Sequence, residues 1–596
     1  MFLRYTTRKK NGKEHCYYSL VENRRAASGR VVQRHALYLG EINDRQQEAW
    51  RKTVEIFEEG QTRPRTVALF PEDRVGPVED ADIVRIRLSQ LSLDRPRQWG
   101  ACWLACALWE QLGLDRFWAE HLPPSRKGTR WDWVLQILVT YRLLDPGSEW
   151  RLSRHWFEHS AMADLLGADR ELAEIHKLYE GHDHLLAQKT KLFAHLTQRW
   201  KDLFNARFEV LLYDLTSTYF ESNPPFPEGD KRRYGYSRDK RSDCVQVVIA
   251  LIVTPEGFPI AYEVLAGNTQ DKQTLADFLK KIQEQYGKAE RIWVMDRGIP
   301  TEQVLEQMRT SDPPVRYLVG TPRGRLTKYE QKLAGLPWQI AREGVSVKLL
   351  TEDQELYILA ESKDRVGKER AMRRRQMKGL WKQLKKIQAM KLKRDQRLEK
   401  VGAALHAYPL AARLVDYTVK SSRGGKLTFR LRKEKLRQRR QREGRYLLRS
   451  NLTSEKSAEQ LWHFYLQLTE VEAAFKTLKD DLALRPIHHQ LENRIEAHIF
   501  ITFLAYGLHV TLHRRLRDLA PGLTPRSVLE KFATIQMLDV LLPTTDGRTV
   551  VLTRYTNPGT DVNLLLQRLK LELPPQPPPK ITTPRRTGAG RLVVKT

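Results

Sequence analysis

Cysteine is scarce in this chain of 596 residues, which has only Cys16, Cys102, Cys106 and Cys244. Because no two of them form a CxxC pair, neither a zinc ribbon nor a disulfide framework is indicated. The first ten residues are basic but lack the apolar core of a signal peptide. The longest apolar runs, such as residues 247–253, are far shorter than the roughly 20 residues that span a bilayer. These absences predict a cytoplasmic protein that does not bind a membrane.

Positive charge is what the chain has in excess. Lys and Arg number 102 against 72 Asp and Glu, for a net charge of +30 in a chain that is 41% hydrophobic. A foldable chain with this charge predicts a polyanionic partner, most often nucleic acid. Residues 361–450 hold 30 basic and 8 acidic residues, a net of +22, and residues 1–45 add 10 − 4 = +6. The charge is therefore concentrated in two segments.

Much of residues 364–404 is compatible with a basic helix. One interpretation is a solvated helix face or a coiled-coil arm. The other is a surface that follows a phosphate backbone, and the excess of one sign favours it because like charges repel one another unless a polyanion neutralises them. The candidate DNA-binding residues on this helix are Arg373, Arg374, Arg375, Lys385 and Lys386.

Hydrophobic periodicity divides the chain into six segments. The segment from residue 206 alternates strands, a hairpin and helices as in a mixed-sheet α/β domain, and this pattern stops between 326 and 450. We expect a basic β module at 1–45 that is a candidate for DNA binding, a helical domain at 46–205, the first part of the α/β core at 206–325, a basic insertion at 326–450, the second part of the core at 451–520, and a C-terminal region at 521–596 with a disordered Pro-rich tail.

Two aspartates occur in apolar strands. Asp214 lies within LLYDLTSTYF, and Asp296 ends the strand IWVMD. A carboxylate in such a strand costs several kcal/mol unless it is paired, hydrogen-bonded or bound to a metal. If the two strands are neighbours, both carboxylates lie at one edge of the sheet, and oxygen ligands of this kind suit Mg²⁺ or Mn²⁺. Either aspartate alone could equally be a strand-end cap or a member of an ion pair.

A third acid is expected on the helix predicted within residues 457–482. Tyr465, Glu472 and Lys479 are spaced at i, i+7 and i+14, which places them on one stripe of a helix. The alternative is that Tyr465 and Lys479 border the core while Glu472 is solvated. Glu470 and Glu496 are rival third acids that lack this register.

These residues resemble a known family. The motifs are YDLTSTYFE around Asp214, GYSRDKRSDCVQ at 235–246, GFPIAYEVLAGNTQD at 257–271, MDRG around Asp296 and RPIHHQLENRIEAHI at 485–499. In this order, residues 206–510 resemble the DDE transposases of bacterial insertion sequences, in particular the insertion sequence four type with its Tyr-x2-Arg-x3-Glu-x6-Lys signature. Leu468 occupies the arginine position of that signature.

The resemblance implies a fold class and a mechanism. The fold would be multidomain α+β, with a ribonuclease-H-like mixed α/β core interrupted by a β-rich basic insertion and preceded by a helical region. Asp214, Asp296 and Glu472 would be catalytic and would bind two Mg²⁺ or Mn²⁺ ions. Tyr465 and Lys479 would contact the backbone of the transposon end. The partners would be double-stranded transposon-end and target DNA, held by a homodimer in the bacterial cytoplasm and associated with the nucleoid.

Two other functions remain open at this stage. One is a ribonuclease-H-like nuclease or resolvase that uses the same metals without strand transfer, and the other is a non-catalytic DNA-binding derivative of a transposase.

Several polar residues near the motifs have a simpler interpretation. Thr216 and Ser217 would either position a phosphate or a metal-bound water, or only cap a strand. Asp239 and Asp243 are expected to form ion pairs with Lys240 and Arg241. The remaining candidates, His488, His489 and His498, lack a zinc-ligand spacing, so we assign them a structural role.

Overall fold

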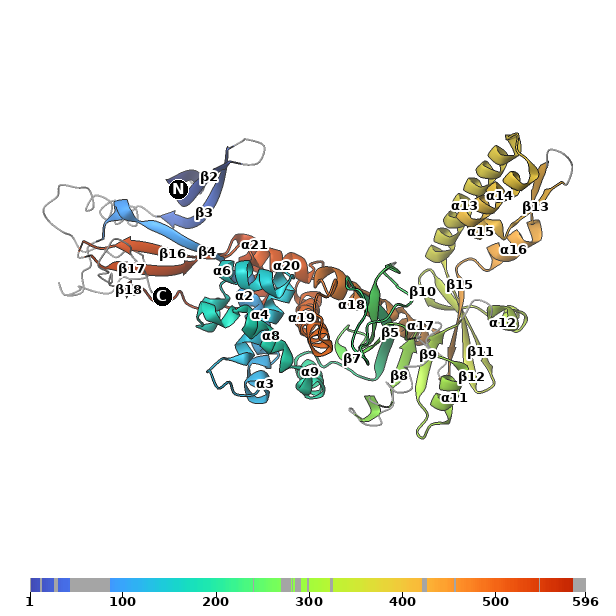
Figure 1. Ribbon diagram of the computed structural model, residues 1–596, viewed down its shortest axis with the longest axis horizontal. Coiled ribbons are helices and arrows are strands. Elements are labelled where there is room, and N and C mark those ends of the chain that lie inside the picture. The colour runs from blue at the N-terminus through green and yellow to red at the C-terminus, as the bar shows by residue number, and fades with distance from the viewer. Residues whose placement is uncertain are drawn as a thin grey trace. The chain divides into compact units, whose positions relative to one another are not determined.

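The structure is a computed structural model (Figure 1). It describes residues 2–10, 13–25, 31–42, 86–239, 241–269, 280, 282–284, 291–296, 300–321, 325–420, 426–454, 457–545 and 547–582. The chain divides into two units. The first unit consists of residues 1–192 and 477–596, and the second unit of residues 193–476.

A nine-stranded sheet organises the second unit, with the strand order β10-β11-β12-β15-β9-β8-β5-β6-β7. Its β7-β6-β5-β8-β9 half pairs β5, β6 and β7 antiparallel, whereas β8 and β9 run parallel to β5. This is the mixed sheet of a ribonuclease-H-like core. The prediction of that fold is confirmed. The bounds are β5 (Val210–Phe220), β6 (Val245–Val253), β7 (Pro259–Ala266), β8 (Ile292–Met295) and β9 (Arg316–Gly320).

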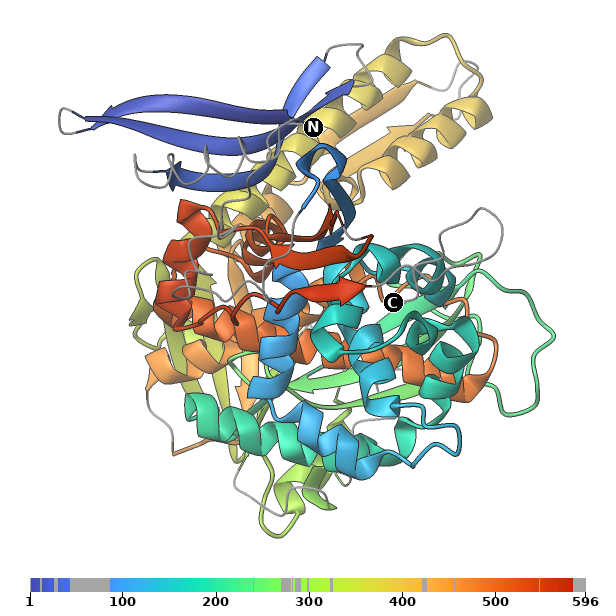
Figure 2. The same ribbon diagram turned by 90° about the vertical axis from the view of Figure 1, so that its left-hand side faces the viewer.

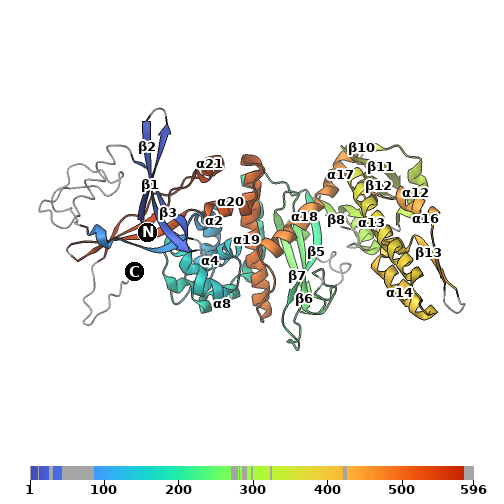
Figure 3. The same cartoon turned by 90° about the horizontal axis from the view of Figure 1, so that it is seen from above.

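Helices cover this sheet. The helix α11 (Glu302–Thr310) begins at Thr301, whose side chain accepts a hydrogen bond from the Val304 amide, and packs its apolar face against the strands. The helix α18 (Leu468–Lys476) packs against β5 (Figure 3). The prediction of one continuous helix within residues 457–482 is wrong. A turn at Gln467 separates α17 (Ala458–Leu466) from α18, and a π-helix, η7 (Thr477–Asp481), follows.

The first strands of the insertion extend the core sheet, and the rest of the insertion lies outside that sheet. After α12 (Arg325–Ala334), three antiparallel strands continue the sheet, and β15 then returns between β12 and β9. We expected the core to resume at the helix near residue 455. It resumes earlier, at β15. These strands are β10 (Gln339–Arg342), β11 (Val345–Glu352), β12 (Glu355–Ser362) and β15 (Arg445–Ser450).

The basic part of the insertion has a hydrophobic core of its own. Leu380, Leu384 and Ile387, three of the sparse apolar positions of the basic helix, are buried in it against apolar residues of α14, α15, β13 and β14. The predicted strands are present together with four helices. The elements are α13 (Lys363–Ala389), α14 (Arg394–Ala407), α15 (Pro409–Ala412), β13 (Val415–Val419), β14 (Leu427–Leu431) and α16 (Lys433–Gln441).

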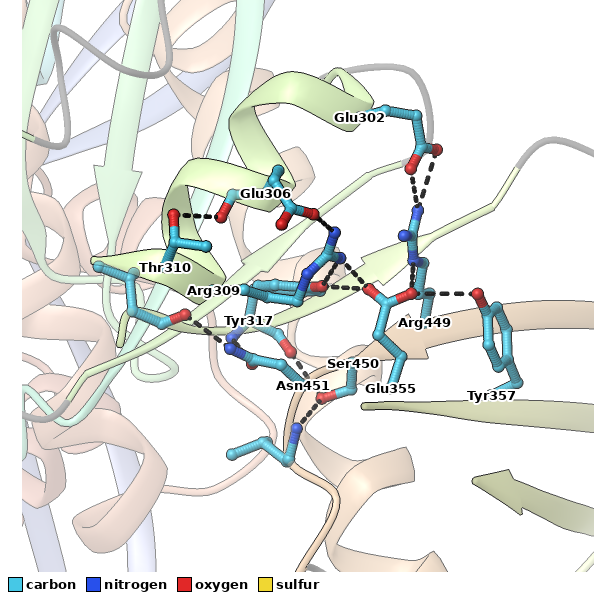
Figure 4. A network of polar contacts seen from close by, with 12 residues as sticks. Glu302, Glu306, Arg309, Thr310, Tyr317, Glu355, Tyr357, Arg449, Ser450 and Asn451 are labelled. Carbon is cyan, nitrogen blue, oxygen red and sulfur yellow. Dashed lines mark hydrogen bonds and ion pairs between the residues drawn. The ribbon is translucent and has the colours of Figure 1, made fainter. Parts of the chain in front are cut away.

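A buried carboxylate, Glu355, connects the added strands to the core (Figure 4). It is 2% exposed at the start of β12 and forms ion pairs of 2.5 Å with Arg309 of α11 and with Arg449 of β15. The hydroxyls of Tyr317 and Tyr357 also donate hydrogen bonds to it. Because a buried charge needs such partners, these contacts fix α11, β9, β12 and β15 in one arrangement.

The first unit is mainly helical around α4 and α19. The long helix α19 (Glu492–Leu519) contains an apolar window that is long enough to cross a membrane, but 89% of that window is buried inside the protein. Our search for apolar runs overlooked it. The other helices of eight or more residues are α2 (Gly100–Gln111), α3 (Leu114–His121), α4 (Trp131–Leu144), α8 (Ile175–Asp183), α20 (Pro525–Phe532) and α21 (Thr560–Leu569). A further helix, α9 (Lys189–Phe204), crosses into the second unit.

Two small sheets complete the first unit. The strands predicted in residues 1–45 form the antiparallel meander β1-β2-β3, drawn in blue in Figure 2. A second sheet has the order β18-β17-β16-β4. The bounds are β1 (Phe2–Lys10), β2 (Lys13–Arg25), β3 (Val31–Ile42), β4 (Ser92–Gln98), β16 (Gln536–Pro543), β17 (Thr549–Tyr555) and β18 (Lys580–Thr582).

Two expectations for the first unit are corrected by this second sheet. The segment 46–205 was expected to be helical, but β4 pairs with β16, which lies more than 400 residues later in the chain. The Pro-rich tail was expected to be disordered, but Gln576 exchanges hydrogen bonds with the backbone of Tyr555, and β18 pairs with β17. The prediction of disorder at 583–596 lies outside the described residues, as does the helical prediction for 46–85.

Candidate active site

The two aspartates predicted to lie together occupy adjacent strands. Because β5 and β8 run parallel with Tyr213 opposite Met295, the residues that follow, Asp214 and Asp296, lie side by side. Asp214 is half-buried midway along β5, and Asp296 is exposed directly after β8. The β5–β8 register therefore brings both carboxylates to one region of the core.

Glu472 completes a group of three carboxylates. It is an exposed residue of α18, the helix that packs against β5. The pKa of Asp214 is raised to about 6, mainly by burial and to a smaller extent by the negative charges of Asp296 and Glu472. Asp296 and Glu472 are therefore both within electrostatic reach of Asp214.

Arg238 is a residue of this site that the sequence analysis missed. Its guanidinium lies 3.8 Å from the Asp214 carboxylate. Together with the Leu215 amide, which donates a 2.8 Å hydrogen bond to Asp214, it lowers the pKa of Asp214 and so opposes the effect of burial. The Arg238 amide also donates to Ser217 Oγ at 3.3 Å, which holds the loop against β5. The feature of the sequence that could have identified Arg238 is its position in the basic motif at 235–246.

The other polar residues near Asp214 are buried or form ion pairs within the protein. Thr216 and Ser217 are both buried on β5. The expected pairing of Asp243 with Arg241 is confirmed, at 2.9 Å, whereas Lys240 lies outside the described residues. Arg241 also lies 3.3 Å from Glu221. These contacts give the loop a fixed polar framework beside the three acids.

The remaining residues of the predicted signature differ in their burial and in the unit to which they belong. Tyr465 is half-buried, with its ring 5.6 Å from that of Tyr446 and 6.0 Å from that of Trp462. Leu468, at the arginine position of the signature, is buried. Lys479 lies in η7 and belongs to the first unit.

The two rival third acids differ in their positions. Glu470 is half-buried on α18, two residues before Glu472. Glu496 pairs with Lys189 at 3.1 Å in the first unit. Asp214, Asp296 and Glu472 thus all belong to the second unit, whereas Glu496 does not.

Comparison with known proteins identifies the family. A family model described as "Transposase DDE domain" matches residues 206–508, half of the chain. The chain belongs to the DDE transposase family. A second model, "IS1634 family transposase, N-terminal domain", matches residues 3–63 of this transposase.

Similarity to individual proteins is weaker. Six solved chains match, among them one in a cryo-EM structure of the piggyBac transposase synaptic complex with hairpin DNA. That chain is 9% identical with a TM-score of 0.35, over 74% of this transposase and 82% of that chain. No curated protein matches this sequence.

The basic helix of the transposase presents four of its five candidate residues to solvent. Arg374, Arg375, Lys385 and Lys386 on α13 are exposed. Arg373 differs, because it is 8% exposed and its guanidinium pairs with the buried carboxylate of Glu443, with one contact at 3.3 Å. Its charge is neutralised inside the protein and is not available to a DNA phosphate.

The three acids fit the divalent metals that DDE transposases use. They supply only carboxylate oxygens, the donors that Mg²⁺ and Mn²⁺ prefer. Burial is the main cause of the raised pKa of Asp214, to which Asp296 and Glu472 add, and a bound cation would relieve their repulsion. The donor set and its electrostatics therefore agree with a metal site at Asp214, Asp296 and Glu472.

Proposed function

We propose that this transposase binds the ends of an insertion sequence, cleaves phosphodiester bonds to free 3′-hydroxyl ends and joins these ends to target DNA by transesterification. The convergence of Asp214, Asp296 and Glu472 in a ribonuclease-H-like core supports the proposal most strongly. The match of residues 206–508 to the transposase family model supports it independently. The insertion sequence four type signature remains a prediction, since the N-terminal match is to the IS1634 family.

The chemistry assigns distinct tasks to the protein side chains. Asp214, Asp296 and Glu472 would hold two divalent cations, which when bound lower the pKa of the attacking hydroxyl and stabilise the leaving oxygen. Arg238 keeps Asp214 ionised by its positive charge at 3.8 Å. The rigid parallel pairing of β5 and β8 keeps the two aspartates in register, so that little reorganisation is needed during the reaction.

DNA binding is assigned to two surfaces of the chain. The exposed residues Arg374, Arg375, Lys385 and Lys386 would neutralise phosphates of the transposon end, as would the basic meander at 1–45. Tyr465 and Lys479 are proposed to contact the backbone of the transposon end. A homodimer would hold the two ends together, because both must be processed in one complex.

Charge-removing variants of the acids test the proposal. Asp214→Asn, Asp296→Asn and Glu472→Gln should each reduce cleavage of a labelled transposon end by at least about a hundredfold while end binding in a gel-shift assay is unchanged. Glu470→Gln, two residues from Glu472 on the same helix, is the matched control and should cleave normally. Wild-type cleavage by any of the three acid variants removes that acid from the site.

A second assay separates a transposase from a nuclease or resolvase. Precut ends that already carry a 3′-hydroxyl are incubated with the protein, Mg²⁺ and a supercoiled target plasmid. A transposase joins the ends to the plasmid. Cleavage of intact ends without any joining of precut ends would instead assign the hydrolytic alternative.

A further inference from the structure

A second group of metal-ligating side chains lies in the first unit, away from the three acids in the sequence. Glu149, His182, His489 and His498 are all buried, and each offers one ligand atom so that these atoms lie within 4.8 Å of one another. They come from the short helix α5 (Glu149–Arg151), from α8, from the loop before α19 and from α19 itself. His488, next to His489, is exposed and does not take part.

The histidines surround one carboxylate oxygen of Glu149. His489 Nε2 lies 3.3 Å from Glu149 Oε1, His182 Nε2 lies 3.4 Å from it, and His498 Nδ1 lies 3.9 Å from it. Charge-assisted N–H···O bonds are shorter, about 2.7–2.9 Å. In a tetrahedral zinc site with bonds of about 2.0–2.2 Å, neighbouring ligand atoms are about 3.3–3.5 Å apart. The two shorter separations agree with the zinc geometry.

The tautomer of His182 points to the same conclusion. Its Nδ1 lies 2.8 Å from the Leu178 carbonyl, which can only accept a hydrogen bond, so Nδ1 carries the proton. When the ring is neutral, Nε2 directs a lone pair at the Glu149 carboxylate, and this nitrogen has no hydrogen-bond partner although His182 is 1% exposed. A cation between the two atoms removes this repulsion. A backbone carbonyl bound to the second nitrogen is also typical of metal-ligating histidines.

The donor types favour a transition metal over Mg²⁺. Three of the four ligands are imidazoles, whereas Mg²⁺ prefers oxygen donors. The guanidinium of Arg142 lies 3.4 Å from His498 Nδ1 and would turn away from that nitrogen when the ion binds, while its charge would offset that of Glu149. Ion selection then depends on the imidazole donors, which suit Zn²⁺.

From this geometry we propose that Glu149, His182, His489 and His498 form a structural Zn²⁺ site, separate from the metals at Asp214, Asp296 and Glu472. The ion would join residues up to 349 positions apart in the sequence, and so fix α5, α8 and α19 together. It would also anchor the loop at His489, which follows the helix of the third acid in the chain. Water does not reach the ion, because all four ligands are buried, so its role is structural and not catalytic.

The experiment measures metal content and ligand field in the full-length protein. The protein is purified from Zn²⁺-supplemented cells, passed through gel filtration in buffer with excess Mg²⁺, and analysed by mass spectrometry for metals. We expect about one Zn²⁺ per chain. Replacement by Co²⁺ should give the intense visible spectrum of a tetrahedral nitrogen and oxygen site. A chelator strong enough to remove Zn²⁺ should lower the melting temperature.

Variants separate this site from its neighbours. Glu149→Gln should lower the Zn²⁺ affinity by at least about a hundredfold, more than the 10- to 100-fold typical of outer-shell changes. The matched control is His488→Gln, which should keep the ion. Asp214→Asn should abolish cleavage and still bind one Zn²⁺, so failure of this site and failure of the proposed function are distinguishable.

Two results would overturn the proposal. The first is a wild-type protein that contains no Zn²⁺, shows no tetrahedral Co²⁺ spectrum and melts at the same temperature with and without chelator, in which case protons or water hold the cluster together. The second is Zn²⁺ binding that is equal in Glu149→Gln and in wild type. The Co²⁺ spectrum of the unmutated chain needs no variant, so it remains decisive even if Glu149→Gln does not fold.

Discussion

The guanidinium of Arg238 lies 3.8 Å from the carboxylate of Asp214. The negative charges of Asp296 and Glu472 also act on this carboxylate. The positive charge lowers the pKa of Asp214, and the two acids raise it. This balance determines at which pH the half-buried aspartate is ionised and can bind a cation.

Removal of the Arg238 charge should move the pH dependence of cleavage. Asp214, with a pKa of about 6 in the folded protein, must be ionised to act, so activity falls as the pH drops through that value. In Arg238→Gln the pKa rises, and the acid limb of the rate profile should shift to higher pH, with a larger loss at pH 6.5 than at pH 8.5. Arg241→Gln, in the same loop, is the control. Equal loss at every pH would mean that Arg238 acts only on DNA.

Asp214→Asn should stabilise the metal-free protein at neutral pH. The folded pKa of about 6 lies above the usual 3.8, so ionisation costs free energy in the folded state. This cost is absent below pH 4, grows as the pH rises to 6 and persists above it, where it amounts to roughly 3 kcal/mol. Urea unfolding in EDTA at pH 8 and pH 4 checks this. A variant that is less stable than wild type at pH 8 would contradict it.

The exposed residues of α13 should determine the salt dependence of DNA binding. Replacement of Arg374, Arg375, Lys385 and Lys386 by Ala should weaken end binding and reduce the slope of log K against log[salt] by about 0.9 for each lost phosphate contact. Fluorescence anisotropy from 50 to 300 mM salt measures the slope. Lys201→Ala, an exposed lysine on α9, should leave it unchanged. An unchanged slope in the fourfold variant would indicate a solvated helix face.

Arg373→Ala should act on stability instead. Loss of this guanidinium leaves the buried carboxylate of Glu443 without its main partner, which costs about 3–5 kcal/mol. Chemical unfolding should show the loss, and the salt slope of DNA binding by the folded variant should equal that of wild type. A reduced slope would return Arg373 to the DNA-binding surface.

Glu355→Gln should destabilise the second unit. The change leaves Arg309 and Arg449 without the carboxylate that they share in the buried network of Figure 4, at a cost of about 3–5 kcal/mol. Glu352→Gln, whose partner Lys332 is exposed, is the matched control and should have little effect on unfolding. Equal stability of the two variants would mean that the network contributes no more than a surface pair.

Local sequence patterns were sufficient for much of the second unit. The apolar strands around Asp214 and before Asp296 are predictable because each strand carries its own hydrophobic run. Their parallel pairing is a finding of the structure. The family motifs supplied the third acid. The basic helix was also predictable, since Leu380, Leu384 and Ile387 recur at helical spacing.

Contacts between distant residues were not predictable in this way. Arg373 and Arg374 are alike in the sequence, yet one pairs with Glu443 inside the insertion and the other is exposed, because only packing determines which face of α13 is covered. The pairing of β4 with β16 and the contacts of Gln576 with Tyr555 likewise join residues that local sequence patterns do not connect.

By itself, then, the sequence determined the charge and the core strands, because these depend on residue type and on short spacings, and with the family motifs it predicted the three acids. Tertiary structure alone decided that Arg238 faces Asp214 and that Glu149 and His182 meet His489 and His498. The four proposed ligand residues lie on separate elements, up to 349 positions apart, so no local spacing in the sequence predicts that they are in contact. Burial strengthens their interactions, because charges and lone pairs removed from water interact strongly with the few groups around them.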